Sequence, residues 1–232
     1  MDLQNRENFL NKLAAKMGKE RAFQPEPMEK PVNTYPTERL TELSLAQRAE
    51  TFCQSAVEMG SELITVSEAE SVQALLDLCE KYGGGDIVLN SDERLTALGM
   101  PAALVTRYNC YNWSPEQGKK NVEFAEKANI GIVYADYGLA ETGGIVLLSD
   151  KERGRSVSLL PEKSIAVLRK SQILPRVAQL SELLHKKAQR GERTPSCINI
   201  ISGPSATADI ELTKVIGVHG PVVQIYLLID DL

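Results

Sequence analysis

The chain has 232 residues, 43% hydrophobic and 25% charged, a composition typical of globular proteins rather than of disordered or fibrous ones. Its net charge of -5 argues against general binding of nucleic acids or anionic membranes. No apolar stretch approaches the ~20 residues that cross a bilayer, and the first residues lack the basic start and apolar block of a secretory signal. We therefore expect a cytoplasmic protein of one or two domains without a membrane span.

The charge is unevenly distributed along the chain. Residues 151–193 hold 11 Lys and Arg against 4 Asp and Glu, whereas the rest holds 15 against 27. A basic stretch of this kind is usual on a solvated face. It also suits a surface that binds an anionic ligand or an acidic partner, and the sequence leaves both interpretations open.

The four cysteines stand far apart, without a C-x-x-C motif or a histidine at ligand spacing: Cys53, Cys79, Cys110 and Cys197. Iron–sulfur and zinc sites need clustered ligands. We therefore expect this chain to bind no metal and to carry no cofactor of its own, and we expect its thiols to be reduced in the cytosol.

The first residues predict an arm. Apolar side chains recur every three or four positions between Asn5 and Gly18, which predicts a short helix. Four prolines follow between Pro25 and Pro36, and proline favours an extended linker because it lacks the amide proton and fixes its own torsion. We predict an arm over 1–37 and one domain over 38–232. The arm helix either packs on the domain or contacts a partner or a second copy, so a homo-oligomer stays open.

From residue 38 onwards the pattern alternates between helices and strands. The predicted helices cover 45–59, 67–82, 92–98 and 119–128, and the predicted strands cover 63–66, 86–89, 109–113 and 130–134. Short apolar strands separated by helices predict a mostly parallel sheet that is covered on both faces.

The middle of the chain shows a different pattern. Three strand-like runs, 145–148, 156–160 and 164–168, are joined by short turns, which favours antiparallel pairing. A long helix is predicted from Pro175 to about Arg190, and 197–201 and 222–229 are predicted as the last strands. The predicted fold class is α/β with a mixed sheet.

The first candidate site is the segment Y-A-D-Y-G-L-A-E-T-G-G at 134–144, between two apolar strands. Its glycines, Gly143 among them, allow a backbone to approach a ligand closely and offer amide donors beside Asp136. Glu141 is the side chain best placed to act as acid, base or nucleophile, since burial beside a sheet end would raise its pKa. The alternative is that Glu141 accepts backbone amides and shapes the turn.

The second candidate site is the segment I-S-G-P-S-A-T-A-D-I-E at 201–211. A strand enters a loop of small polar residues and then the predicted start of a helix, where free amides favour an anion. Gly203, Ser205 and Thr207 are the candidate ligand-binding residues, and either of the two hydroxyl side chains is the expected helix cap.

A glycine-flanked histidine follows this segment. His219 lies in G-V-H-G-P and either braces its loop or takes part in catalysis. Ligands of parallel sheets gather beyond the carboxyl ends of the strands. We therefore predict that Glu141, Ser205, Thr207 and His219 line one cleft.

Several segments together resemble the lactate-utilization protein C family. They are YADYGLAETG at 134–143, GRSVSLLP at 154–161, ILP at 173–175, SGPSATADIE at 202–211 and GVHGP at 217–221, in the same order and at similar spacing. The resemblance covers the chain almost end to end. It implies a domain of the kind named for lactate utilization (LUD), with a three-layer Rossmann-like sandwich and a mixed sheet, similar to phosphosugar isomerases and CoA transferases.

The resemblance also implies a function. The family takes part in oxidising L-lactate to pyruvate in a three-protein system, in which proteins A and B carry the cysteine-rich iron–sulfur motifs. This chain would be the accessory or substrate-site subunit, with a small organic acid as a ligand. The alternative is a free-standing isomerase or acyl-CoA transferase-like enzyme that uses Glu141, although fold likeness does not carry activity.

Overall fold

The computed structural model describes residues 3–21, 30, 32–208 and 213–232, in two compact units, Met1–Thr34 and Tyr35–Leu232. The first unit holds helix α1, Leu3–Lys16, on which Phe9 and Leu13 are exposed. The proline-rich linker predicted after it falls largely on residues outside the described part of the chain.

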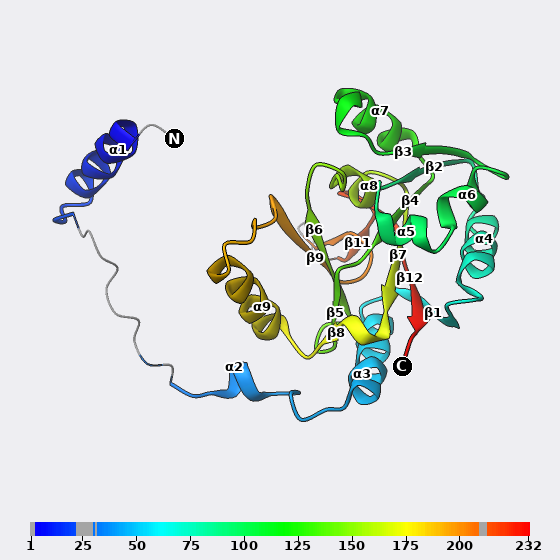
Figure 1. The fold of residues 1–232 in the computed structure, drawn as a ribbon, viewed down its shortest axis with the longest axis horizontal. Coiled ribbons are helices and arrows are strands. Elements are labelled where there is room, and N and C mark those ends of the chain that lie inside the picture. The colour runs from blue at the N-terminus through cyan, green and yellow to red at the C-terminus, as the bar shows by residue number, and fades with distance from the viewer. Residues whose placement is uncertain (1–2, 22–29, 31, 209–212) are drawn as a thin grey trace. The chain divides into compact units, whose positions relative to one another are not determined.

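The second unit is built on a six-stranded parallel sheet in the order β1-β12-β7-β4-β2-β3 (Figure 1). Its strands are β1 Glu62–Ser67, β2 Asp86–Leu89, β3 Asn109–Asn112, β4 Ile130–Tyr134, β7 Lys163–Arg169 and β12 Val223–Asp230. Every neighbouring pair in this sheet is parallel. All five residues of β4 are buried, which explains why the central strands are continuous apolar runs in the sequence.

Helices cover both faces of the parallel sheet. The helices α4 Ser71–Lys81, α5 Glu93–Ala97 and α6 Met100–Leu104 pack on one face, and α3 Leu45–Glu58, α7 Lys119–Lys127 and α8 Ser156–Leu159 pack on the other. Phe52 of α3 and Tyr226 of β12 pack against each other on the α3 side of the sheet, with tilted rings whose centroids are 5.6 Å apart. The predicted α/β sandwich is confirmed.

A second, four-stranded sheet has the order β8-β5-β6-β9 and contains the mixed pairing. Its strands are β5 Tyr137–Leu139, β6 Gly144–Ser149, β8 Ile173–Leu174 and β9 Cys197–Ile201. Strand β6 is antiparallel to β5 and β9, whereas β5 and β8 are parallel. Helix α9, Val177–Gln189, packs on this sheet through Leu180.

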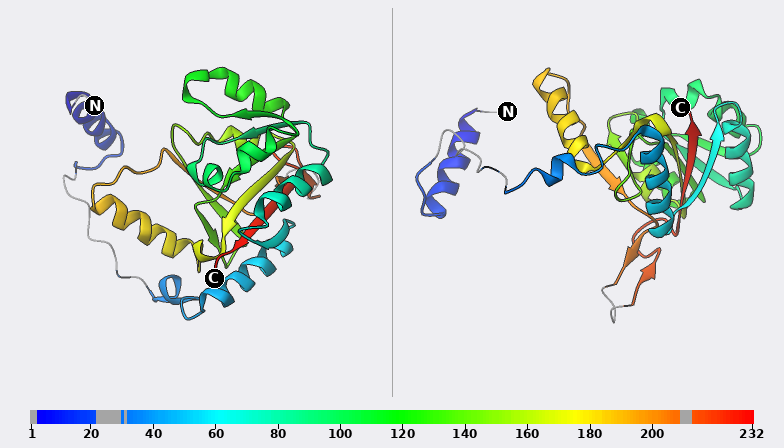
Figure 2. Two further views of the ribbon diagram at one scale, coloured as in Figure 1. Left: turned by 45° about the vertical axis from the view of Figure 1, so that its right-hand side comes forward. Right: turned by 90° about the horizontal axis from the view of Figure 1, so that it is seen from below.

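Further short elements of the described unit are helix α2, Tyr35–Glu38, the 3-10 helices Pro115–Gln117 and Lys170–Gln172, and the strands β10, Ala206–Thr207, and β11, Val215–Ile216. The antiparallel pair β10–β11 projects from the body in the right-hand view of Figure 2. Because 206–207 are a strand, a helix that begins directly after a Ser205 cap is wrong, whereas the alternative with a Thr207 cap stays a prediction. The predicted first turn, from Asp209 to Glu211, lies outside the described residues.

The strand predicted over 156–160 is also wrong, because Ser156–Leu159 form helix α8. The alternating sequence reflects a buried Val157 that packs over β4 at Gly131, where any side chain would overlap the Val157 carbonyl. Helix α8 carries the chain from the second sheet back to the central one. Strand β7 is therefore parallel to β4 and β12, and the predicted antiparallel pairing of this run is wrong.

The start of one helix and the presence of another also differ from the prediction. Helix α4 begins at Ser71, because Ser67 still belongs to β1 and its hydroxyl donates to Glu70 at 2.6 Å in the turn between them. The predicted helix over 92–98 is present as α5, and α6 follows it without having been predicted.

Candidate functional site

The strand order places a topological switch point between β2 and β4. The chain leaves β2 through α5 and α6 towards the edge strand β3, whereas it leaves β4 towards β7 on the opposite side. In open parallel sheets, ligands bind outside the carboxyl ends of the strands at such a point. The segments that meet there are 90–94, after β2, and 135–136, after β4.

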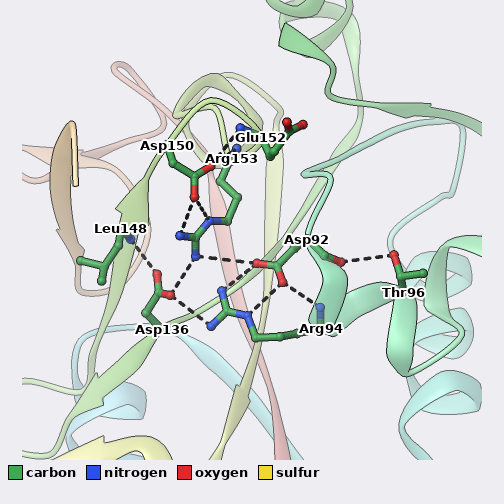
Figure 3. A network of polar contacts seen from close by, with 8 residues as sticks. All are labelled: Asp92, Arg94, Thr96, Asp136, Leu148, Asp150, Glu152 and Arg153. Atoms are coloured by element: carbon green, nitrogen blue, oxygen red, sulfur yellow. Dashed lines mark hydrogen bonds and ion pairs between the residues drawn. The ribbon is translucent and has the colours of Figure 1, made fainter. Parts of the chain in front are cut away.

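A network of ion pairs fills this switch point (Figure 3). The Asp92 carboxylate accepts from Nε and Nη2 of Arg94 at 2.9 and 2.7 Å, and it caps α5 by accepting from the Arg94 backbone N–H. Asp136 Oδ1 lies 3.0 Å from Arg94 Nη1 and 2.9 Å from Arg153 Nη1. Arg153 also pairs with Asp150 at 2.7 Å. The network thereby joins the loops that follow β2, β4 and β6.

Most of this charge is withdrawn from solvent. The side chains of Asp92 and Asp136 are 5% and 11% exposed, whereas that of Arg94 is 37% exposed. Burial alone would lower the pKa of Arg94, but the hydrogen bonds with Asp92 and the charge of Asp136 outweigh this effect and raise it. The guanidinium is therefore a permanent cation that stays partly accessible to solvent.

A cavity of about 380 Å³ opens beside the network, beyond the carboxyl ends of β1, β2, β4 and β7. It is lined by Glu68, Arg94, Ala97, Leu98, Tyr134, Arg169 and Gln172. The Arg94 guanidinium lies over the Tyr134 ring, 4.4 Å from its centroid, and Arg169 pairs with Glu68 at 2.5 Å. A further cavity of about 390 Å³ adjoins Asp150 and Arg153 on the network's other side.

Burial raises the pKa of the Tyr134 phenol, against the opposing influence of Arg169 and Arg94. The phenol therefore keeps its proton at neutral pH and can donate a hydrogen bond.

Asn90 adds an unsatisfied polar group to the site. It follows β2 directly and is 8% exposed, and within the described part of the chain its Oδ1 has no hydrogen-bond partner. With Tyr134 and Asp136 it lines a void of about 10 Å³, roughly the space of one water molecule. Buried acceptors are nearly always satisfied, so this oxygen marks a place for a water molecule or a ligand group.

The two carboxylates of the predicted segment 134–144 have different places. Asp136 precedes β5 and belongs to the network, where its Oδ2 also accepts from the Leu148 N–H at 2.7 Å. Glu141 follows β5 and lies in its turn to β6, with Arg176 Nε at 2.7 Å and Arg39 Nη1 at 3.4 Å. Arg176 also donates to the Tyr35 carbonyl at 3.3 Å. Glu141 therefore ties the turn to α2 and to the residue that precedes α9.

The two predicted ligand-binding glycines both lie against helix α3. Gly143 has φ +59 and packs where any side chain would overlap the backbone of Ala56, and Gly203 has φ +76 and packs likewise on the carbonyl of Met59. Both glycines therefore allow the backbone to pack closely on the C-terminal end of α3, and their predicted role in binding a ligand stays a prediction.

The second predicted segment adjoins the first. Ser202 Oγ donates to the Thr142 carbonyl at 2.7 Å, which brings the loop at 202–207 against the turn that holds Glu141. The Ser205 N–H donates to the Pro221 carbonyl at 2.9 Å, so the loop with the exposed His219 lies beside Ser205.

Thr207 lies in β10 and is half-buried. A shared cleft of Glu141, Ser205, Thr207 and His219 stays a prediction.

The residues that sequence reasoning missed are Asn90, Asp92, Arg94, Arg153 and Arg169. A signal was present for the first three, because N-S-D-E-R begins directly after the buried run that forms β2. The two later arginines carry no local signal, since only the strand order brings them to the same edge.

The described residues include no group of three or more His, Cys, Asp or Glu side chains that could hold a metal ion, and the four cysteines are free thiols. Within the same ranges no helix is long and apolar enough to span a membrane.

Fold and site together define an α/β protein with a Rossmann-like parallel sheet and a charged crevice at its switch point. The charged crevice is the cavity lined by Arg94, Tyr134 and Arg169. The LUD domain family model matches residues 49–229, and the chain belongs to this family. "Uncharacterized protein YkgG" of Escherichia coli (strain K12) is 51% identical over 99% of this chain and 100% of its own length.

Proteins named "Lactate utilization protein C" from Halalkalibacterium halodurans and Bacillus subtilis (strain 168) are 39% and 35% identical. Each alignment covers 99% of this chain, and 99% and 98% of the respective relatives. The resemblance to the lactate-utilization protein C family is confirmed. A crystal structure of a DUF162 family protein from Deinococcus radiodurans shares the fold, with a TM-score of 0.57 and 21% identity over 81% of this chain and 99% of that chain.

Proposed function

We propose that this protein is a component of an L-lactate oxidation system, in which it serves as an accessory or substrate-site subunit. The observation that carries the proposal is the end-to-end similarity to proteins named for lactate utilization, over nearly the full length of both chains. A shared domain alone would be weaker support, because one fold hosts many activities.

The charged crevice supports the substrate-site role within that system. The cations Arg94 and Arg169 and the Tyr134 phenol face one cavity, and guanidinium groups are the side chains best suited to carboxylates. Lactate and pyruvate both carry a carboxylate. The crevice therefore offers the chemistry that a substrate-site subunit needs.

Oxidation of L-lactate to pyruvate releases two electrons and two protons, so an electron acceptor is required. We propose that iron–sulfur clusters on partner proteins A and B take the electrons, as the family resemblance implies. The described cysteines of this chain are free thiols.

Gene deletion in the native host tests the proposal. We expect the deletion strain to lose growth on L-lactate as sole carbon source and to grow normally on pyruvate, with growth on L-lactate restored by the wild-type gene. A tagged chain purified anaerobically from lactate-grown cells should co-elute with iron–sulfur proteins. Unimpaired growth of the deletion strain on L-lactate would contradict the proposal.

A further inference from the structure

We propose that the cavity between Arg94 and Arg169 is a binding site for a short organic monocarboxylate. The inference deepens the proposed function and rests on it only for the choice of lactate and pyruvate as probes. The geometry that supports it involves three donor groups, an apolar wall and the carboxylates that already pair with the two arginines.

Arg94 has donors left for a ligand. A guanidinium has five N–H groups, and the recorded contacts with Asp92 and Asp136 occupy three of them. Stacking on the Tyr134 ring fixes the plane of the group, and its side chain lines the cavity. Donors held in a fixed plane lose little freedom when a carboxylate binds, which favours affinity.

Arg169 supplies a second cation at the far wall of the cavity. It extends from the carboxyl end of β7, two strands from β2 in the sheet, and its side chain is 28% exposed. The neutral Tyr134 phenol stands between the two arginines in the sheet order, at the end of β4. A carboxylate in the cavity can therefore accept from a guanidinium, and the phenol can donate to an adjacent oxygen.

The remaining walls restrict the ligand. Ala97 and Leu98, at the end of α5, form an apolar side that suits a short alkyl group. Glu68 and Asp231 already pair with Arg169, at 2.5 and 3.7 Å, and Asp92 and Asp136 already neutralise much of the charge on Arg94. A second negative charge on the ligand would meet these carboxylates without a free cation, so a monoanion fits better than a dicarboxylate or phosphate.

Calorimetric titration of the purified full-length protein tests the site. L-lactate, pyruvate, succinate and inorganic phosphate are added separately at constant ionic strength. We expect saturable binding of L-lactate or pyruvate, and about 10-fold weaker binding of the two polyvalent anions, a factor that corresponds to about 1.4 kcal/mol. Equal or tighter binding of phosphate or succinate, or no saturable binding at all, would overturn the inference.

Three variants locate the binding site. Arg169→Gln should weaken binding about 10- to 100-fold through loss of a charged hydrogen bond. Tyr134→Phe, which removes only the hydroxyl group, should weaken it about 10-fold. Ala97→Phe should weaken it by a similar factor, because the larger side chain occupies the cavity and leaves every ion pair intact. Since Ala97 is exposed on α5, this variant remains informative where Arg169→Gln does not fold.

Arg107→Gln is the matched control, because it removes the same charge from an exposed position away from this cavity. We expect its affinity to equal that of the wild type. An equal loss in Arg107→Gln and Arg169→Gln would show non-specific attraction and overturn the site. The binding experiment and the deletion experiment can fail independently, because growth on L-lactate can depend on this protein whether or not the cavity binds the acid.

Discussion

Asp136 and Glu141 lie at the two ends of β5, and each is paired with two arginines, yet their surroundings differ. The partners of Asp136 are Arg94, in α5, and Arg153, in the loop after β6, at the switch point of the parallel sheet beside two cavities. The Glu141 carboxylate meets Arg176 and Arg39, which hold peripheral elements together. Two acidic residues five positions apart therefore have different surroundings, because their arginine partners come from different parts of the fold. Asp136 belongs to the candidate site, whereas Glu141 connects peripheral elements.

Gly143→Ala tests how closely the turn that holds Glu141 packs on α3, and it should have the largest effect on stability. A methyl group there overlaps the Ala56 backbone and also strains a residue at φ +59, so we expect a loss of about 3 kcal/mol or more in the free energy of unfolding. Gly99→Ala is the matched control, because φ there is +75 and the added carbon meets open space. It should cost about 1–2 kcal/mol in urea unfolding. Equal losses would contradict the packing role of Gly143.

The network at the Asp136 end is tested by Asp92→Asn. The substitution keeps an oxygen for the helix cap and removes the nearly buried negative charge beside Arg94. Breaking a buried pair typically costs about 3–5 kcal/mol. Because Arg94 is 37% exposed, we expect about 2 kcal/mol here, measured as the shift in urea unfolding. If Asp92→Asn lowers the free energy of unfolding no more than Glu141→Gln does, the ion pairs at the switch point are no more stabilising than those of Glu141.

Glu141→Gln tests whether Glu141 has a chemical role in addition to its ion pairs with Arg39 and Arg176. If Glu141 anchors the turn, the change should cost about 1 kcal/mol and leave growth on L-lactate intact at normal protein abundance. Loss of a general base typically costs about 10²–10⁴ in rate. Growth on L-lactate and soluble protein level are measured in the same cells. Normal abundance without growth would support the chemical role predicted for Glu141, and the arrangement with Arg176 and Arg39 leads us to expect growth.

The smallest expected effect concerns Asp150 and acid pH. Burial alone would raise the pKa of Asp150, but the hydrogen bond and charge of Arg153 lower it below its ordinary value. A carboxyl whose pKa is lower in the folded state adds stability above the unfolded pKa of about 4 and loses it as the pH falls. Below about pH 5, Asp150→Asn should therefore lose less stability than the wild type in urea unfolding. If the wild type and Asp150→Asn lose the same stability as the pH falls, the Asp150–Arg153 pair contributes nothing to the pH dependence.

Much of the fold was predictable because its signals are local. Strands β2 and β4 were predicted residue for residue, since buried parallel strands are short apolar runs between helices. The run at 156–160 was not, because alternation in five residues suits a strand as well as a helix packed on Gly131.

The candidate site was predictable only in part. Asp136 was singled out from its turn, but Arg94 and Arg169 are 75 residues apart and meet only through the order of β2, β4 and β7. A sequence pattern without strand order cannot bring such residues together. Glu141 and Asp136 gave the same local signal, and only their arginine partners distinguish them.

We propose that the charged crevice at the switch point serves lactate utilization. Its most direct test is growth of the deletion strain on L-lactate after complementation with Arg169→Gln or with Arg107→Gln, at matched soluble abundance. We predict that Arg107→Gln restores wild-type growth and that Arg169→Gln does not, while both strains grow equally on pyruvate. Equal growth of the two strains on L-lactate would contradict the claim.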